Sequence, residues 1–237
     1  MEKTNFILFG PKILTNVNEI SLIIDNNVIK RTTSIKYLGV IITSNLSWLE
    51  HINYISKKIS RNIGILSKFK YFFSKTVLIS LYYTLIYPYY NYCLSIWGSS
   101  PQTHLNILLK TQKHYLRVIY NIGKYNSISP FFHTSNILAI PEIYRLSLGI
   151  LAFKLINIKI YPSLIPYINS FQNHSIRLLR HPSQFYLSKV RTDLYYNSPL
   201  ICILRIWNNL PIDLKCFNSI GLFKKHLKFF IQSNKLD

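Results

Sequence analysis

Acidic residues are scarce in this sequence. Its 237 residues include 8 aspartates and glutamates against 28 lysines and arginines, so the formal net charge is +20 at pH 7. The acids are scattered singly, and no two aspartates are adjacent. Two-metal nucleotidyl transfer needs clustered carboxylates, and the sequence offers no site for that chemistry. The same imbalance favours a polyanionic partner, nucleic acid first and an anionic membrane surface second, because counterion release drives the binding of cations to phosphates.

Cysteine is scarce as well. Cys93, Cys202 and Cys216 lie far apart and form no CxxC pair with zinc-ligand spacing, which predicts a reducing compartment and no metal site. The sequence contains no GxxxxGK(S/T) loop, GxSxG elbow or HExxH motif, so phosphate-cradling, acyl-transfer and zinc-peptidase chemistries lack support. The seven histidines are interpreted as surface or capping residues, and no cofactor is expected in this chain.

No apolar segment follows a basic start, so we expect no secretory signal and an intracellular location, nuclear or cytoplasmic. Residues 76–109 carry no Lys, Arg, Asp or Glu and are long enough to span a bilayer. Pro88 and Pro101 interrupt them, and tyrosines lie throughout their interior, which is not typical of spanning helices. We therefore expect no membrane span, and a membrane-associated interaction protein is the least favoured interpretation.

Aliphatic, largely β-branched residues predict strands in the N-terminal fifth of the chain. Residues 22–24 and 28–29 flank Asp25, Asn26 and Asn27, which tolerate the left-handed conformations of a hairpin turn. A second β-branched run at 35–42 ends in the polar turn 43–45. An N-terminal β-hairpin sheet is therefore expected.

From about residue 50 the apolar residues recur every three or four positions, which predicts an amphipathic helix. Its apolar face contains Ile52, Ile55, Ile59, Ile63 and Leu66. Its opposite face contains Lys57, Arg61 and Lys68. Such a face is by default only the solvated side of a helix, but here no interleaved acids form neutralising i,i+4 pairs. The uncompensated charge favours a binding role.

Two further helices follow in the pattern. Ser74 is placed to cap the first, which Pro88 breaks or kinks. Ser100 is placed to cap the second before Pro101, and Gly123 lies just past its expected end. The apolar face of this last helix contains Leu105, Leu108, Gln112, Tyr115 and Ile119.

The remaining sequence predicts a smaller C-terminal part. Residues 143–158 are apolar at helical spacing, 173–197 are polar and basic, and 199–210 are apolar again. Ser219 is placed to cap a last helix with Leu222, Phe223, Leu227 and Phe230. The expected fold is α+β and mainly helical, with an N-terminal β-hairpin sheet, a three-helix bundle and a small mixed C-terminal subdomain.

Short motifs also occur along nearly the whole chain in a consistent order and spacing. KTNFILF at 3–9 precedes KYLGV at 36–40, LSW at 46–48 and HI at 51–52. LYYTLIYPY follows at 81–89, then HSIR at 174–177, WNNLP at 207–211 and FKKHL at 223–227. This ordered series resembles the downstream part of LINE-type, jockey-like non-LTR retrotransposon reverse transcriptases, which are RNA-directed DNA polymerases.

The resemblance implies a division into three regions. Residues 1–49 resemble the end of the palm and the primer-grip hairpins, 50–123 the thumb, and 124–237 the C-terminal region of such a polymerase. It also implies that the primer grip and the thumb lie beside the RNA–DNA duplex. The nucleic-acid-binding residues expected on this basis are Lys36, Tyr37, Leu38, Gly39, Lys57, Arg61 and Lys68.

The fingers, and the palm carboxylates that hold two divalent metal ions in an intact polymerase, would precede Met1. The chain alone is therefore expected to bind RNA, DNA or their hybrid without copying it, and no catalytic residue is assigned. An alternative is a host-retained module that binds nucleic acid without sequence preference.

Overall fold

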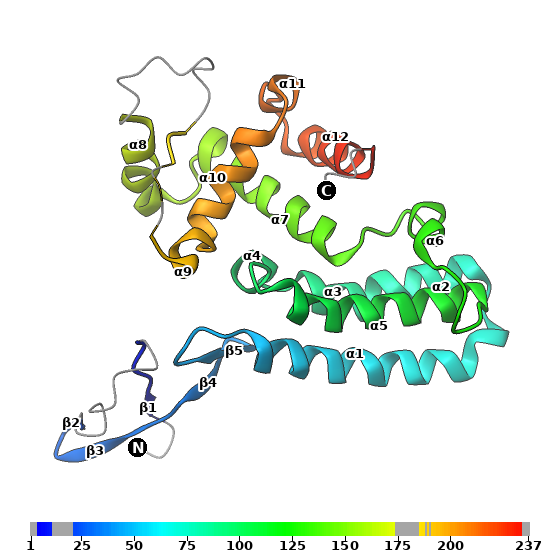
Figure 1. Ribbon diagram of the computed structural model, residues 1–237, viewed down its shortest axis with the longest axis horizontal. Coiled ribbons are helices and arrows are strands. Elements are labelled where there is room, and N and C mark those ends of the chain that lie inside the picture. Colours follow the sequence, from blue (N-terminus) through cyan, green and yellow to red (C-terminus); the bar gives the residue numbers. More distant parts are fainter. Residues whose placement is uncertain (1–3, 11–20, 174–184, 188, 190, 234–237) are drawn as a thin grey trace.

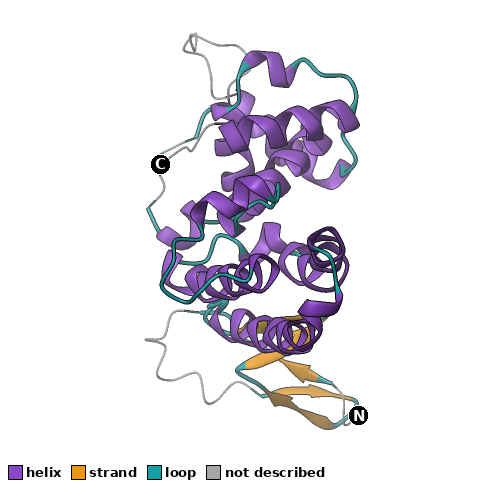
Figure 2. Ribbon diagram, turned by 90° about the vertical axis from the view of Figure 1, so that its right-hand side faces the viewer, coloured by secondary structure: helices purple, strands orange, loops and turns teal. Residues whose placement is uncertain are grey.

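The computed structural model describes residues 4–10, 21–173, 185–187, 189 and 191–233. The chain is mainly helical with a small mixed sheet at the N-terminus, so the predicted α+β class is confirmed at this level. In Figure 1 the strands extend from the beginning of α1, and the helices form a lower layer around α1, α3 and α5 and an upper layer around α10 and α12. Figure 2 shows the same stacking from the side, with the strands at one end.

The first three strands are β1 (Asn5–Phe6), β2 (Leu22–Ile24) and β3 (Asn27–Arg31). They form a sheet in the order β1-β3-β2, in which β1 is parallel and β2 antiparallel to β3. The turn between β2 and β3 places Asp25 and Asn26 at φ values of 48° and 60°. The predicted hairpin is therefore confirmed.

The second β-branched run is not one strand but a hairpin of β4 (Ser34–Tyr37) and β5 (Val40–Thr43). Its turn residues, Leu38 and Gly39, both have positive φ, 45° and 85°. Two such residues in succession characterise the turns that match the twist of hairpin strands. A positive φ is energetically unfavourable for leucine. The turn has a contact from outside the hairpin, because the Tyr92 hydroxyl donates a 2.6 Å hydrogen bond to the Leu38 carbonyl.

The predicted amphipathic helix is α1 (Leu49–Phe69), and all five apolar residues of its expected inner face are buried. A 3-10 turn, η2 (Lys70–Phe72), leads to α2 (Lys75–Leu81). The Ser74 hydroxyl accepts a 3.3 Å hydrogen bond from the Val77 N–H, as its predicted capping role requires.

Pro88 does not end the second helix. The hydrogen-bond ladder widens into a π-helical segment, η3 (Tyr82–Ile86), and continues as α3 (Tyr87–Asn91) with Pro88 in its first turn. At that position proline's missing N–H costs little, because the preceding segment has already changed the ladder. A short helix, α4 (Leu94–Trp97), follows Cys93, which has a φ of 51°.

The third bundle helix is α5 (Gln102–Tyr120), and its five predicted inner residues are all buried. Its ends differ from the expectation. Pro101 occupies the N-terminal capping position, and the buried Ser100 hydroxyl has no hydrogen-bond partner among the described residues, so the predicted Ser100 cap is wrong. At the other end the helix stops at Asn121, with a φ of 52°, two residues before Gly123.

The described residues after 124 form helices and contain no strand, so the expected mixed character of this region is not found there; residues 174–184 lie outside the described part. The elements are α6 (Ser129–Thr134), α7 (Ile140–Phe153), η4 (Lys154–Ile158), η5 (Pro162–Leu164), α8 (Ile165–Asn173), α9 (Asp193–Tyr196), α10 (Pro199–Asn209), α11 (Ile212–Lys215) and α12 (Ile220–Ser233). In α12, Phe223 and Leu227 are buried as expected, whereas Leu222 is exposed.

The helix α7 lies at the centre of the molecule. It contacts α3, α4 and α5 of the lower layer and α10 and α12 of the upper one. One buried apolar cluster consequently runs from Ile52 to Ile231. Close approach needs glycine at two places: a Cβ on Gly149 would lie 2.5 Å from Leu227 Cδ2, and one on Gly98 would overlap the Tyr144 ring.

Within the described residues, no helix taken singly is both long and apolar enough to cross a bilayer. The pair Ile140–Ile158 and Pro162–Phe171 reaches that length and composition only across an 89° bend.

Candidate nucleic-acid interface

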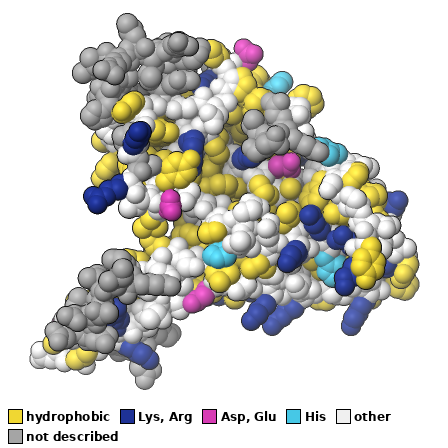
Figure 3. All heavy atoms as spheres, viewed as in Figure 1, with side chains coloured by type: hydrophobic (Ala, Val, Ile, Leu, Met, Phe, Trp, Pro, Cys, Tyr) yellow, Lys and Arg dark blue, Asp and Glu magenta, His cyan; other side chains and the backbone are white. Residues whose placement is uncertain are grey.

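The outer face of α1, defined by Lys57, Arg61 and Lys68, is exposed along its length. Lys68 lies eleven positions after Lys57, which is about 16 Å along a helix at 1.5 Å per residue. None of the three forms an ion pair with a residue that the structure describes. Figure 3 shows Lys and Arg side chains along the edge of the molecule that α1 forms. The face is therefore an extended positive track with no internal neutralisation.

Lys36 lies against this helix because the β4–β5 hairpin folds onto it. Its Nζ donates a 2.8 Å hydrogen bond to the Tyr54 hydroxyl and lies 4.8 Å from the centre of that ring. The Nζ of Lys58 lies 4.7 Å from the centre of the Tyr54 ring and 5.8 Å from that of Tyr89. The hydrogen bond from Lys36, and then the proximity of Lys58, lowers the pKa of Tyr54.

The lysine–tyrosine cluster of Lys36, Tyr54, Lys58 and Tyr89 was not predicted. The i,i+4 spacing of Tyr54 and Lys58 was visible in the sequence, but Lys36 is 18 residues from Tyr54 and only the fold brings them together. The cluster positions two ammonium groups next to α1's outer face. It therefore adds Lys58 to the cations that a polyanion would meet there.

The other predicted residues of the hairpin form its exposed turn. Tyr37 and Leu38 extend into solvent, and a Cβ on Gly39 would lie 3.5 Å from the Tyr92 ring. Tyr92 thus supports the turn from behind while the two exposed side chains face outward. The seven predicted residues consequently form no pocket: four lie at the hairpin beside the start of α1, and Lys57, Arg61 and Lys68 continue along the helix.

His51 contradicts the interpretation of the histidines as surface or capping residues, since only 2% of it is exposed. Its Nδ1 accepts a 3.3 Å hydrogen bond from the Ile41 N–H, and its ring lies edge-on to Trp97, with centroids 5.6 Å apart. Burial lowers the pKa of His51 to about 4. It is therefore neutral at physiological pH and joins β5, α1 and α4 rather than contributing charge.

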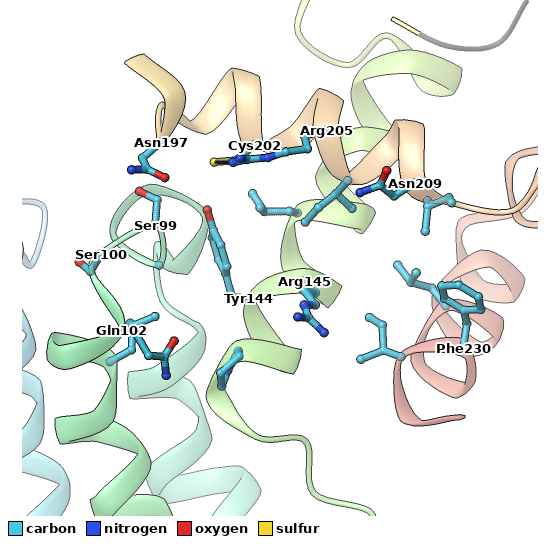
Figure 4. A pocket seen from close by; sticks show the side chains of 18 residues that line it. Ser99, Ser100, Gln102, Tyr144, Arg145, Asn197, Cys202, Arg205, Asn209 and Phe230 are labelled. Carbon is cyan, nitrogen blue, oxygen red and sulfur yellow. Dashed lines mark hydrogen bonds between the residues drawn. The ribbon is translucent and has the colours of Figure 1, made fainter. Parts of the chain in front are cut away.

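A cavity of about 480 Å³ lies between α4, α7, α10 and α12 (Figure 4). An Nη of Arg205 donates to Cys202 Sγ at 3.1 Å and to the Tyr196 carbonyl at 3.4 Å, and the guanidinium lies 4.0 Å from the centre of the Tyr196 ring. The buried Tyr144 hydroxyl has no partner among the described residues, and burial raises the pKa of Tyr144. The described lining contains no His, Asp or Glu, so Cys202 has no general base there.

The described part of the chain contains no group of three or more His, Cys, Asp or Glu side chains that could hold a metal ion. No protein-family model matches the sequence, and no curated protein or solved structure matches it significantly.

Proposed function

We propose that this chain binds the sugar–phosphate backbone of RNA, DNA or their hybrid along the outer face of α1. One observation carries the proposal: Lys57, Arg61 and Lys68 are exposed on one helix face and unpaired with described residues. Cations in this state release the counterions of a nucleic acid on binding, and the free energy gained does not depend on base sequence. The net charge of +20 supports the same partner.

The ordered motifs favour an origin in a LINE-type reverse transcriptase, with the β4–β5 hairpin as the primer grip and the α1–α5 bundle as the thumb. The hairpin's attachment to α1 through Lys36 and Tyr54 supports this proposal, since a grip and a thumb must hold one duplex together. In an intact polymerase the two metal ions would be held by the palm.

The purified chain should incorporate no nucleotides when it is supplied with a primed RNA template, nucleotides and magnesium or manganese. Template-dependent extension that survives removal of contaminating polymerases would contradict that expectation.

The salt dependence of binding tests the outer face directly. Each phosphate neutralised on duplex DNA contributes about 0.9 to the slope of log K against log salt concentration. Replacing Lys57, Arg61 and Lys68 by Gln should therefore lower that slope by about three and weaken all sequences alike.

The matched control replaces Lys159, Lys224 and Lys225 by Gln. These lysines are exposed on η4's end and on α12, away from α1, and the variant loses the same net charge. The control should keep most of the wild-type slope. An unchanged slope in the α1 variant, or an equal loss in both variants, would show that α1's outer face is only solvated.

A further inference from the structure

A second cationic feature lies at the end of the bundle opposite the strands, where the C-terminal ends of α1 and α5 meet. A cavity of about 710 Å³ opens there between the two helices and the chain that follows α5. Its lining contains three cations, Lys70, Arg117 and Lys124, together with His114, and no acid. Figure 3 shows Lys, Arg, His and apolar side chains gathered over this end. We call this cavity and the aromatic residues beside it the tip site.

Two of the cations are held in place but keep unused donors. The Nζ of Lys70 donates to Asn121 Oδ1 at 2.7 Å, and an Nη of Arg117 donates to the Asn126 carbonyl at 3.4 Å. The Nε of Arg117 is buried and has no partner among the described residues. A guanidinium carries five N–H donors and an ammonium three, so both side chains have more donors than the hydrogen bonds recorded for them. A phosphate group, with several acceptor oxygens and negative charge, complements this arrangement.

Helix geometry alone does not account for these cations. Basic side chains are favoured at helix C-termini, where they neutralise the partial charge of the last carbonyls. Here, however, the recorded hydrogen bonds of Lys70 and Arg117 go to Asn121 Oδ1 and to the carbonyl of Asn126, which lies beyond the end of α5. The recorded hydrogen bonds of these two side chains are therefore made to Asn121 and Asn126, and not to the last backbone carbonyls of α1 or α5.

Exposed aromatic residues are the sequence neighbours of two lysines that line the cavity. Tyr71 follows Lys70, and Tyr125 follows Lys124; they are 78% and 94% exposed, and Phe72 is 81% exposed. The Lys70 Nζ lies 4.8 Å from the centre of the Tyr71 ring. Exposed aromatic rings beside a cationic groove are the arrangement by which proteins bind single-stranded nucleic acid without sequence preference, because any base can stack on such a ring.

An anionic membrane is the other polyanion that lysines and aromatic residues attract. The concavity favours nucleic acid, because a phosphate can enter a cavity of this size while a bilayer surface meets only what protrudes. The hydrogen bonds that hold Lys70 and Arg117 in place also favour nucleic acid over a membrane, since lysines at a membrane surface act as unfixed point charges.

From these observations we infer that the tip site binds a single-stranded segment of nucleic acid, with a backbone phosphate in the cavity and neighbouring bases stacked on Tyr71, Phe72 and Tyr125. The inference rests on nucleic acid as the partner in the proposed function, but it uses residues separate from the outer face of α1. A duplex bound along α1 and a single strand at the tip are therefore two measurable activities.

Fluorescence anisotropy with the full chain distinguishes them, using a dye-labelled oligothymidylate and a labelled duplex of equal length. Replacing Tyr71, Phe72 and Tyr125 together by Ser should weaken single-strand binding by at least about tenfold, the equivalent of one lost stacking interaction. Duplex binding should change by less than about twofold to threefold, which is the ordinary scatter of such comparisons. The control replaces Tyr161, Tyr167 and Tyr195 by Ser. These tyrosines are exposed outside the tip site, so the control should leave both affinities unchanged.

The phosphate subsite has its own readout. Replacing Lys70 and Lys124 by Gln should lower the salt slope of single-strand binding by about 0.7 for one phosphate. If the aromatic variant and this variant both bind the single strand as wild type does, while the α1 variant still loses duplex affinity, the inference fails and the proposed function stands. If wild type binds neither oligonucleotide, both fail. Loss of binding to phosphatidylserine vesicles in the aromatic variant, without loss of single-strand binding, would make the tip a membrane contact and overturn the inference.

Discussion

The helices α1 and α7 are built from similar apolar periodicity but occupy opposite environments. α1 buries one stripe and leaves its outer cations in solvent, whereas α7 is contacted by helices of both layers. Charge on α1's outer face therefore contributes little to folding and is available to a partner. Around α7, by contrast, small changes in side-chain volume or hydrogen bonding should lower the stability of the whole fold, because interiors are close-packed. The two helices thus separate binding from stability, and each prediction below tests that separation.

The largest effect is expected for Gln112→Leu, where α5 meets the start of α7. The Gln112 Nε2 donates to the Tyr82 hydroxyl at 2.8 Å and the Leu138 carbonyl at 2.7 Å, and its Oε1 accepts from the Ile140 N–H at 3.2 Å. Leucine would leave these three buried groups without partners, at about 1–3 kcal/mol each, so the free energy of unfolding should fall by at least about 3 kcal/mol.

Urea denaturation measures this loss. The control, Gln102→Leu, alters an exposed residue whose hydrogen bond joins it only to Asn106 on the same helix, and it should change stability by less than about 0.5 kcal/mol. Comparable losses in the two variants would mean that the α5–α7 contact is not special.

The next prediction compares two glycine-to-alanine substitutions that should change the stability of the protein in opposite directions. Gly98→Ala should destabilise the protein by about 1–3 kcal/mol, because the new Cβ would overlap the Tyr144 ring of α7 and lie 2.5 Å from the Leu94 carbonyl oxygen. Gly64→Ala, on exposed α1 with no atom near the new Cβ, should stabilise by roughly 0.5–1 kcal/mol. Urea midpoints report both, and a shared sign would contradict the contrast between the helices.

The inner side of α1 should show a pH dependence that its outer face lacks. The pKa of His51 is about 4 in the folded protein against about 6.5 when unfolded. Because the unfolded state binds the extra proton, stability is complete above pH 6.5 and falls as pH drops towards 4, by at most about 1.4 kcal/mol per pH unit. His51→Asn keeps an acceptor for the Ile41 N–H without titrating, so it should flatten that slope. His114→Asn, at an exposed position of α5, controls for the substitution; equal slopes in wild type and His51→Asn would refute the assignment.

The smallest stability effect is expected at the outer face itself. Replacing Lys57, Arg61 and Lys68 by Gln should change the free energy of unfolding by less than about 0.5 kcal/mol, since Gln has similar helix propensity and the buried stripe is untouched. Urea denaturation of the variant used for the salt titration provides the measurement. A large loss would tie these cations to the fold and make their binding data uninterpretable.

Periodicity predicted the helices well because a buried stripe must repeat at the helical period. All five inner residues of α1 and all five of α5 were identified this way. The Asp25–Asn26 turn was equally visible, since both residues tolerate positive φ. What periodicity cannot supply is tertiary support. Leu38 adopts a positive φ with its carbonyl bonded to Tyr92, 54 residues away, so the residue pattern alone predicted one continuous strand at 35–42, and only the resemblance implied a hairpin there.

The candidate site shows the same division between local pattern and tertiary contact. The outer cations of α1 follow from spacing within one helix, and the structure places them on one exposed face. Lys58 was missed because its place in the cluster depends on its contact with the Tyr54 ring. Tyr54 also binds Lys36, which lies on a different element, the strand β4. The tip site joins residues as far apart as Lys70 and Asn121, and no local pattern links them.

The parallel course of α1 and α5 also constrains how the chain reaches its native state. Both helices end at the tip, so the chain must return along the bundle through α2, η3 and α3 before α5 can begin. The Lys70–Asn121 contact consequently closes a loop of 51 residues, and the entropy of that closure is lost before the contact stabilises anything. Adjacent antiparallel helices avoid this delay. The bundle is therefore expected to fold more slowly than a helical protein with only local contacts.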